Sequence, residues 1–363
     1  MINRSLLYNQ FWLYRLVCCA RQVFYNWRIG RLTDSYKPLF IILFPLAILY
    51  GCIMTMLCMG KVAKQMKEDL IKPFDDELSV VAILKNEAPY VREWIEYYRL
   101  LGATRFYIYD NDSQDNVKEV ISDYIDSGIV VYKYFPGKYR QNVMAYTDAI
   151  NNYASKTRFM AVIDLDEFIV PIDDKLTLID VLKNIVRWKP YAAGVAIPWL
   201  MYGSSHHKTR PEGLVIDNYL YRAQDSFMLN AKSFMLNVKT VFNPRLVNGH
   251  NNPHYPVYKY GAFSINENGH IVIGKFDTHK SCKQIRINHY FTKSEEEFRA
   301  KVTKGNVDTS SRTFDEFVQW DKNDVYDGIM LRYSERIKRN MQNCTKRSPG
   351  PRVCVGNEGT SRL

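Results

Sequence analysis

Short apolar blocks alternate with longer mixed polar and apolar stretches through the middle of the chain. The apolar blocks are rich in Val, Ile and aromatic residues, which is typical of strands, and several mixed stretches end at Gly, as helices often do. The expected strands are 79–84, 105–110, 129–134 and 158–164, and the expected helices are 89–102, 115–128 and 138–156. This alternation predicts an α/β domain built on a parallel, doubly wound sheet.

A different pattern precedes this domain. The 21 positions of residues 39–59 contain no charged side chain, and a helix needs roughly 20 apolar residues to cross a bilayer. Pro45, near the middle of the run, also permits a re-entrant hairpin that returns to the same face. We therefore expect a transmembrane or re-entrant helix at 38–60, after a basic amphipathic segment at 1–37 and before a polar linker at 61–77.

Charge is distributed unevenly. The formal net charge is +11, but residues 1–72 carry ten Lys and Arg against three acids, and residues 331–363 carry eight against two. A nucleic-acid-binding protein usually concentrates positive charge on its folded domain, so we expect no nucleic-acid partner. Basic ends instead suit the anionic surface of a lipid bilayer. We expect residues 311–363 to form a helical, basic tail.

Cysteine usage bears on the compartment. The seven Cys show neither metal-type spacing nor the pattern of a disulfide framework, which favours a reducing environment. We expect the α/β domain to lie at the cytoplasmic face of a membrane, or in the Golgi lumen if the source is eukaryotic.

Polar clusters follow three of the predicted strands. The first strand ends at Lys85-Asn86-Glu87, the second in YDNDSQD, and the fourth in DLDEF. In open α/β sheets ligands bind beyond the carboxyl ends of the strands. We therefore expect these clusters to surround one crevice.

The DLDEF cluster contains Asp164, Asp166 and Glu167 in close succession. Carboxylates held together repel each other, and one pKa rises unless a cation is present. Mg²⁺ or Mn²⁺, bound by carboxylates and completed by a diphosphate, would remove this conflict. The alternative is a capped turn in which Asp166 and Glu167 face water.

Four motifs occur in a fixed order and carry a resemblance. They are KNEAPYVREWIEYYRLLGATRFYIYDNDS, DLDEF, WLMYGSS and NHYFTKSEEEFRAKVTKG. Together they resemble glycosyltransferase family 92 and related bacterial glycosyltransferases of the family 2 type, over about residues 80–306. The resemblance implies a GT-A type nucleotide-diphospho-sugar transferase fold, for which we expect a catalytic domain at 78–310.

The resemblance also implies roles for individual residues on the donor side. Asp164 and Asp166 match a D-x-D motif that binds Mn²⁺ or Mg²⁺ and the diphosphate of the donor, and His289 matches a residue that completes the metal shell. Imidazole suits Mn²⁺ better than Mg²⁺. Glu87 and Asp110 match positions near the nucleoside, and Lys293 is placed to neutralise the leaving diphosphate.

On the acceptor side, Trp199 and Gly203 match a W-x-x-x-G segment, and His254 is expected to face the acceptor. A buried structural Trp is an equal alternative. Inverting transfer needs a carboxylate base; Asp217 occupies a position where relatives often carry an acid, and Asp225 follows it.

These features predict a membrane-attached, metal-dependent glycosyltransferase. It would move a sugar, such as a hexose, from a UDP-sugar to a glycan or glycolipid acceptor with inversion. One alternative is a non-catalytic protein that binds sugars or nucleotides on the same scaffold. Another is a basic adaptor at the membrane surface, which would have no affinity for nucleotides.

Overall fold

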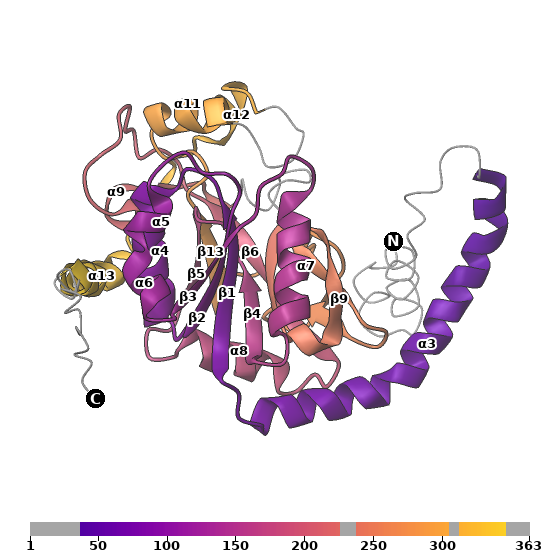
Figure 1. Ribbon diagram of the computed structural model, residues 1–363. Helices are drawn as coiled ribbons and strands as arrows, with labels where there is room; N and C mark the ends of the chain where they lie inside the picture. Colours follow the sequence, from indigo (N-terminus) through magenta and orange to yellow (C-terminus); the bar gives the residue numbers. More distant parts are fainter. Residues whose placement is uncertain (1–36, 226–236, 305–311, 346–363) are drawn as a thin grey trace, which may run out of the picture.

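The computed structural model describes residues 37–225, 237–304 and 312–345. A mixed β-sheet lies at its centre, and helices cover both faces (Figure 1). The strands follow the order β12-β11-β6-β8-β4-β1-β2-β3, and β13 joins β6 to β5. The strand bounds are β1 Asp76–Leu84, β2 Arg105–Asp110, β3 Val130–Tyr134, β4 Thr157–Val162, β5 Glu167–Pro171, β6 Ala192–Met201, β8 Val238–Phe242, β11 Phe263–Ile265, β12 Ile271–Val272 and β13 Ile285–His289.

The first half of the sheet confirms the strand predictions. Strands β1 to β4 are parallel neighbours in the order β4-β1-β2-β3. The expectation of a parallel sheet throughout is wrong. Strand β8 comes late in the chain but lies between β4 and β6, antiparallel to both. The alternating pattern that predicted parallel pairing ends at β4, so the sheet is mixed.

Helices α4 (Ala88–Leu100) and α7 (Gln141–Tyr153) lie on opposite sides of the sheet (Figure 1). The predicted helix at 115–128 forms as two short helices that divide at Ile121. The helix bounds are α3 Lys37–Ile71, α4 Ala88–Leu100, α5 Val117–Val120, α6 Ser122–Asp126, α7 Gln141–Tyr153, α8 Leu178–Val186, α9 Val215–Asn218, α11 Glu295–Lys304, α12 Asp315–Trp320 and α13 Leu331–Thr345, and the short elements are β7 Tyr221–Arg222, η4 Pro244–Leu246, β9 Val247–Asn252, β10 Tyr255–Tyr258 and β14 Val325–Tyr326.

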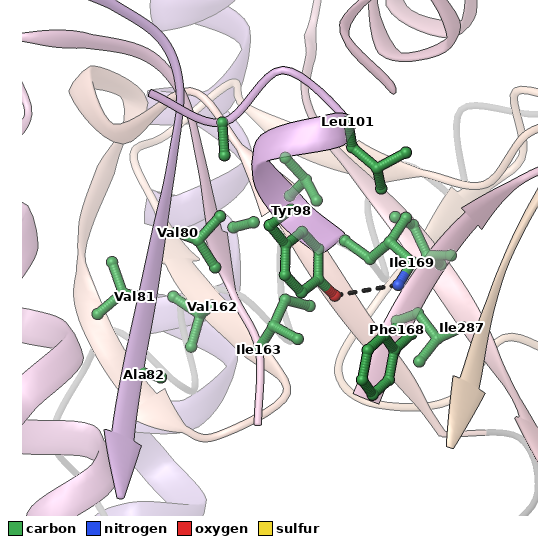
Figure 2. Close-up of a cluster of buried hydrophobic side chains, with 14 of the residues drawn as sticks. Val80, Val81, Ala82, Tyr98, Leu101, Val162, Ile163, Phe168, Ile169 and Ile287 are labelled. Atoms are coloured by element: carbon green, nitrogen blue, oxygen red, sulfur yellow. Dashed lines mark hydrogen bonds between the residues drawn. The ribbon is translucent and has the colours of Figure 1, made fainter. Parts of the chain in front are cut away.

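The hydrophobic core connects α4 to the strand that follows the acidic cluster. Figure 2 shows Tyr98 among aliphatic side chains of β1, β4 and β5. Its hydroxyl accepts a hydrogen bond from the backbone N–H of Ile169 at 3.0 Å and donates one to the carbonyl of Glu167 at 3.1 Å. Buried hydroxyls need such partners. The start of β5 is therefore fixed to α4.

Helix α3 is longer than the helix predicted at 38–60. Its backbone is helical from residue 37 to residue 71, so the chain does not return in a hairpin at residue 45, and the linker predicted at 61–77 is helical to Ile71. The polar stretch conceals an apolar stripe, because Val62 and Met66 are one turn apart and both buried. Among the residues that the structure describes, no helix meets the length and apolarity needed to cross a membrane. The segment predicted at 1–37 lies outside the described residues, apart from the first residue of α3.

Several contacts dock α3 onto the domain. The Asp69 carboxylate accepts hydrogen bonds from Arg245 at 2.8 Å and from Asn243 at 2.7 Å. Nearer the start of α3, the helix approaches Gly261 of the domain closely. Gly261 adopts φ +85°, and a Cβ at this position would lie 2.9 Å from the backbone nitrogen of Met59 on α3. Both the conformation and the close approach favour glycine.

The C-terminal region is partly integrated into the domain. In the described part of the predicted tail, α13 packs against α4, and Tyr333 and Ile337 are buried. These two positions lie one turn apart, which is the spacing of a helix face that packs on a core. The predicted tail is therefore packed on the domain through α13.

Candidate functional site

The acidic cluster occupies the turn between β4 and β5. Asp164 and Asp166 lie on this turn, and Glu167 begins β5. The N–H of Glu167 donates to the carbonyl of Asp164 at 3.1 Å, and the indole of Trp94 on α4 donates to that same carbonyl at 3.1 Å. The turn is therefore held from both sides at the carboxyl end of β4, where the sequence predicts it.

A cavity of about 790 Å³ opens beside this turn. It brings together six of the predicted site residues, from β6, β13, the β9–β10 turn and the segments that follow β1 and β4. These six residues are Glu87, Asp164, Asp166, Trp199, His254 and His289. Its cationic lining residues are Lys85, Lys138, Lys239, Lys301, Lys304 and Arg312, and Glu316 adds a fourth carboxylate.

A buried lysine compensates the first carboxylate. Lys239 on β8 is 1% exposed, and its ammonium nitrogen lies 2.8 Å from a carboxylate oxygen of Asp164 and 3.5 Å from one of Glu167. Burial raises the pKa of Glu167 well above its usual range, outweighing the effect of Lys239. Lys239 keeps its charge, because the carboxylates overcome the opposing effect of burial on its pKa.

A second lysine compensates the next carboxylate. The Lys301 ammonium donates to Asp166 at 2.6 Å and to the carbonyl of Phe291 at 2.9 Å. Burial would raise the pKa of Asp166, but the charge of Lys301 holds it well below its usual range. Asp166 is therefore ionised, and the turn carries no uncompensated carboxylate pair.

Of the three predicted metal ligands, Asp164, Asp166 and His289, only Asp166 and His289 lie close together. Asp166 Oδ1 lies 3.6 Å from His289 Nε2, a separation at which both atoms can contact one ion. Asp164 is instead drawn towards Lys239. In residues 37–225, 237–304 and 312–345 no group of three or more His, Cys, Asp or Glu is arranged to hold a metal ion. The metal ligands predicted from the sequence therefore stay a prediction, of which the structure brings Asp166 and His289 together.

Asp166 and His289 nevertheless fit a metal site in which the substrate supplies the remaining ligands of the ion. Burial lowers the pKa of His289, and no hydrogen-bond partner for its Nδ1 is found in the described part of the chain. The imidazole is thus neutral, which is the form that binds metals. Mg²⁺ and Mn²⁺ sites often use one or two protein ligands together with substrate phosphates.

Aromatic side chains form the other wall of the cavity. The ring of Trp199 lies 5.1 Å from that of His254 and 4.3 Å from that of His289. The carbonyl of Val238 lies 3.1 Å from His254 Nδ1. Burial lowers the pKa of His254 to about 3. The imidazole is therefore neutral, with Nδ1 donating and Nε2 left as an acceptor.

Two predicted donor residues lie outside this cavity. The Asp110 carboxylate accepts hydrogen bonds from the Tyr132 hydroxyl and, at 2.9 Å, from the N–H of Ser113, so it stabilises the strand end. Lys293 places its ammonium 3.4 Å from the ring centre of Tyr90. It lines an adjoining cavity of about 360 Å³ that shares Asp166 with the first.

Two other predictions have structural explanations. Gly203 does not line the cavity; a Cβ there would lie 2.4 Å from the carbonyl oxygen of Lys322, so glycine permits this close packing. Asp217 on α9 forms an ion pair with Lys338 of α13 at 2.7 Å. Since Asp217 does not line the cavity, the structure does not support it as the base.

Sequence reasoning missed the lysines of the site. Lys239 interrupts the apolar run VKTVF of β8, and a Lys inside a buried strand is rarely tolerated without a partner. That interruption was an available signal. Lys301 and Lys304 lie one turn apart on α11, and only the fold shows that this helix reaches the β4–β5 turn.

Comparisons with known proteins identify the family of the chain. The model of glycosyltransferase family 92 matches residues 81–330. A family 92 protein of Oryza sativa subsp. japonica is 31% identical over 145 residues, which cover 40% of this chain and 24% of that protein. A family 92 protein of Ricinus communis is 25% identical over 146 residues, which cover 40% and 26%. Each alignment thus covers about a quarter of the plant protein.

Solved structures give a weaker similarity. TarS of S. aureus has a TM-score of 0.32 at 11% identity, over 59% of this chain and 60% of that one. HddC of Yersinia pseudotuberculosis has a TM-score of 0.27 at 9% identity, over 49% and 81%. The family assignment depends on the sequence match, which spans more than half of the chain: the protein belongs to glycosyltransferase family 92.

Proposed function

We propose that this protein is a metal-dependent glycosyltransferase of the GT-A type. It transfers a sugar, such as a hexose, from a nucleoside-diphosphate donor to a glycan or glycolipid acceptor, and UDP-sugars are the first donors to test. The observation that carries the proposal is the cavity at the end of β4, in which Asp164 and Asp166 lie among basic side chains.

The charge of the cavity suits a diphosphate. Its lining holds six Lys or Arg and four Asp or Glu, an excess of two positive charges. Lys301 and Lys304 are paired with Asp166 and Glu87, whereas no ion pair of Lys85 or Lys138 is found among the described residues. Fixed cations aimed at a leaving group stabilise the charge that develops as it departs.

Asp166 and His289 are the residues that would hold Mn²⁺ or Mg²⁺. A bound ion would act as a Lewis acid towards the diphosphate oxygens. Lys239 keeps Asp164 in place by its contact at 2.8 Å, which leaves Asp164 beside the donor site. Lys301 prevents repulsion between Asp166 and Asp164 before the donor arrives.

The acceptor is expected at the aromatic wall. The neutral His254 offers an acceptor nitrogen to a sugar hydroxyl, and Trp199, which is 4% exposed, packs behind it against the rings of His254 and His289. An inverting reaction needs a carboxylate base. Once Asp164 and Asp166 are assigned to the donor, Glu87 and Glu316 are the remaining carboxylates of the cavity lining.

Membrane attachment is part of the proposal. The outward face of α3 exposes a row of large apolar side chains, which is unusual for a face in water. These residues are Leu46, Leu49, Ile53, Met56 and Leu57. We place the domain at the cytoplasmic face of a bilayer, or in the Golgi lumen of a eukaryotic cell.

The test is release of nucleoside diphosphate from a panel of sugar nucleotides, with the chain in detergent and Mn²⁺ present. Release from one donor, lost with chelator and in Asp166→Ala, supports the proposal. Asp225→Ala is the matched control, because its side chain is 77% exposed. Binding of nucleotide without turnover, even with a panel of acceptors, would instead favour a non-catalytic binding protein.

A further inference from the structure

A second hollow lies at the opposite edge of the sheet from the proposed active site. It has a volume of about 760 Å³ and lies between the end of α3 and the end of α8. Its floor is apolar and includes Met66, Leu70 and Val186. An apolar floor inside a polar rim is typical of a site for an amphipathic ligand.

Four basic residues border this hollow: Lys64, Lys67, Lys183 and Arg187. Lys183 forms an ion pair with Glu77 at 2.8 Å. Lys64 lies 3.9 Å from Glu68 on an exposed turn of the helix. Arg187 is exposed, and no ion pair of Arg187 or Lys67 is found within the described ranges. The rim therefore has excess positive charge towards solvent, which complements an anionic ligand.

The hollow continues the exposed apolar face of α3. Lys64, Lys67 and Ile71 follow Ile53 and Leu57 at intervals of three, four or seven residues, so they share one side of the helix. This side is opposite to the stripe that packs on the domain through Val62 and Met66. One helix face thus changes from apolar to basic along its length.

An exposed tryptophan adjoins the basic rim. The Trp188 side chain is 77% exposed, and the Arg187 guanidinium lies 5.6 Å from its ring centre. Trp is enriched where a protein meets the boundary between lipid and water, and basic helices with one apolar face lie flat in that boundary. The two helices therefore present the chemistry of a membrane surface.

We propose that the hollow between α3 and α8 binds the headgroups of anionic phospholipids, with the apolar face of α3 and the ring of Trp188 at the acyl boundary. This site rests on the membrane attachment proposed above and not on the reaction proposed for the cavity. Anionic headgroups attract Lys and Arg near the bilayer, and the apolar floor accommodates the upper part of an acyl chain.

The site would also orient the domain. Strand β1 begins just after α3 and β6 just after α8, whereas the active-site cavity lies where β1 and β4 end. The nine residues of β1 separate the two edges by about 26 Å. In Figure 1 the second half of α3 runs along the lower edge and β1 leads away from it. The cavity would therefore face away from the bilayer.

The experiment compares partitioning of the full chain onto vesicles of neutral phosphatidylcholine and onto vesicles that also contain phosphatidylglycerol. Lys67→Gln/Arg187→Gln removes two rim charges without disturbing the Lys183–Glu77 pair. We expect its partition coefficient to fall about 30-fold on anionic vesicles and to stay unchanged on neutral ones.

A matched control variant, Lys118→Gln/Lys208→Gln, removes two exposed charges elsewhere and should stay within about twofold of the parent chain. Brominated anionic lipid should quench part of the tryptophan emission, and Trp188→Phe should reduce that part. The proposal is overturned if the rim variant partitions like the control variant. It is also overturned if the rim variant loses binding to both kinds of vesicle, or if Trp188→Phe leaves the quenching unchanged.

Discussion

The ammonium nitrogen of Lys239 lies 2.8 Å from the carboxylate of Asp164, inside the fold and 1% exposed. A strand that ends in three acids is electrostatically unfavourable on its own, and this lysine, with Lys301 beside Asp166, removes much of the cost. The β4–β5 turn is therefore stable without substrate.

Replacing Lys239 should destabilise the fold. Lys239→Met removes the cation beside Asp164, whose side chain is 43% exposed and stays hydrated, so we expect a loss of about 2 kcal/mol, below the roughly 3–5 kcal/mol of a fully buried pair. The free energy of unfolding, measured with urea, checks this. Lys133→Met is the control, since Lys133 is 44% exposed in its pair with Asp148 and should cost less than about 1 kcal/mol. Equal losses in the two variants would refute the buried role of Lys239.

The docking of α3 should depend on Asp69. This carboxylate is 2% exposed and accepts hydrogen bonds from Arg245 and Asn243. Asp69→Ala leaves those buried donors without an acceptor, so we expect the free energy of unfolding to fall by about 3 kcal/mol. We also expect faster protease cleavage within residues 61–71. Limited proteolysis measures the second effect. Glu68→Ala, on the exposed face, should behave like the parent chain; indistinguishable cleavage of both variants would contradict a docked helix.

Glu93 should make stability depend on pH. Burial raises the pKa of Glu93 to about 7 from its ordinary value of 4.5, against the hydrogen bonds from the N–H groups of Val215 and Ile216. The folded state holds this proton more tightly, so the stabilisation is complete below pH 4.5 and is lost as the pH rises through about 7. Urea unfolding across pH 4.5–8 should show a loss on the order of 2–3 kcal/mol that is absent in Glu93→Gln. Parallel curves for the two proteins would exclude this assignment.

The catalytic base can be located by comparing carboxylates. Asp217 is paired with Lys338 outside the cavity, so Asp217→Asn should keep kcat within about threefold. Loss of the base costs about 10²–10⁴-fold in kcat, and this loss should appear in Glu316→Gln or in Glu87→Gln. A large fall in kcat for Asp217→Asn, with normal folding, would restore Asp217 as the candidate.

The sequence predicts the first half of the sheet well, because its information is local. Strand 105–110 corresponds to β2 without any shift, and the acidic residues at the end of β4 lie at the edge of the sheet where the cavity forms. Local patterns do not show that β8 inserts between β4 and β6. Lys239 reaches Asp164 only through that insertion, so the main electrostatic partner of the turn could not be predicted.

The same reasoning explains the residues that were misplaced. Asp217 and Gly203 are predicted from their position relative to motifs, but their neighbours come from α13 and from residues 322–323, which are distant in the chain. Likewise, the stretch at 61–71 looks polar because its buried stripe is narrow. Its role as a docked helix depends on Asn243 and Arg245, far along the sequence.

The most direct measurement of the central claim is calorimetric titration of nucleoside diphosphates into the chain, with and without Mn²⁺. The account predicts binding of at least one nucleoside diphosphate that weakens at least tenfold without the metal and in Asp166→Asn. Asp225→Asn should bind normally. Binding that is equally tight without Mn²⁺ and in Asp166→Asn would contradict the proposed metal role of the β4–β5 turn, and no binding of any nucleotide to the folded chain would contradict the assignment of the cavity as a donor site.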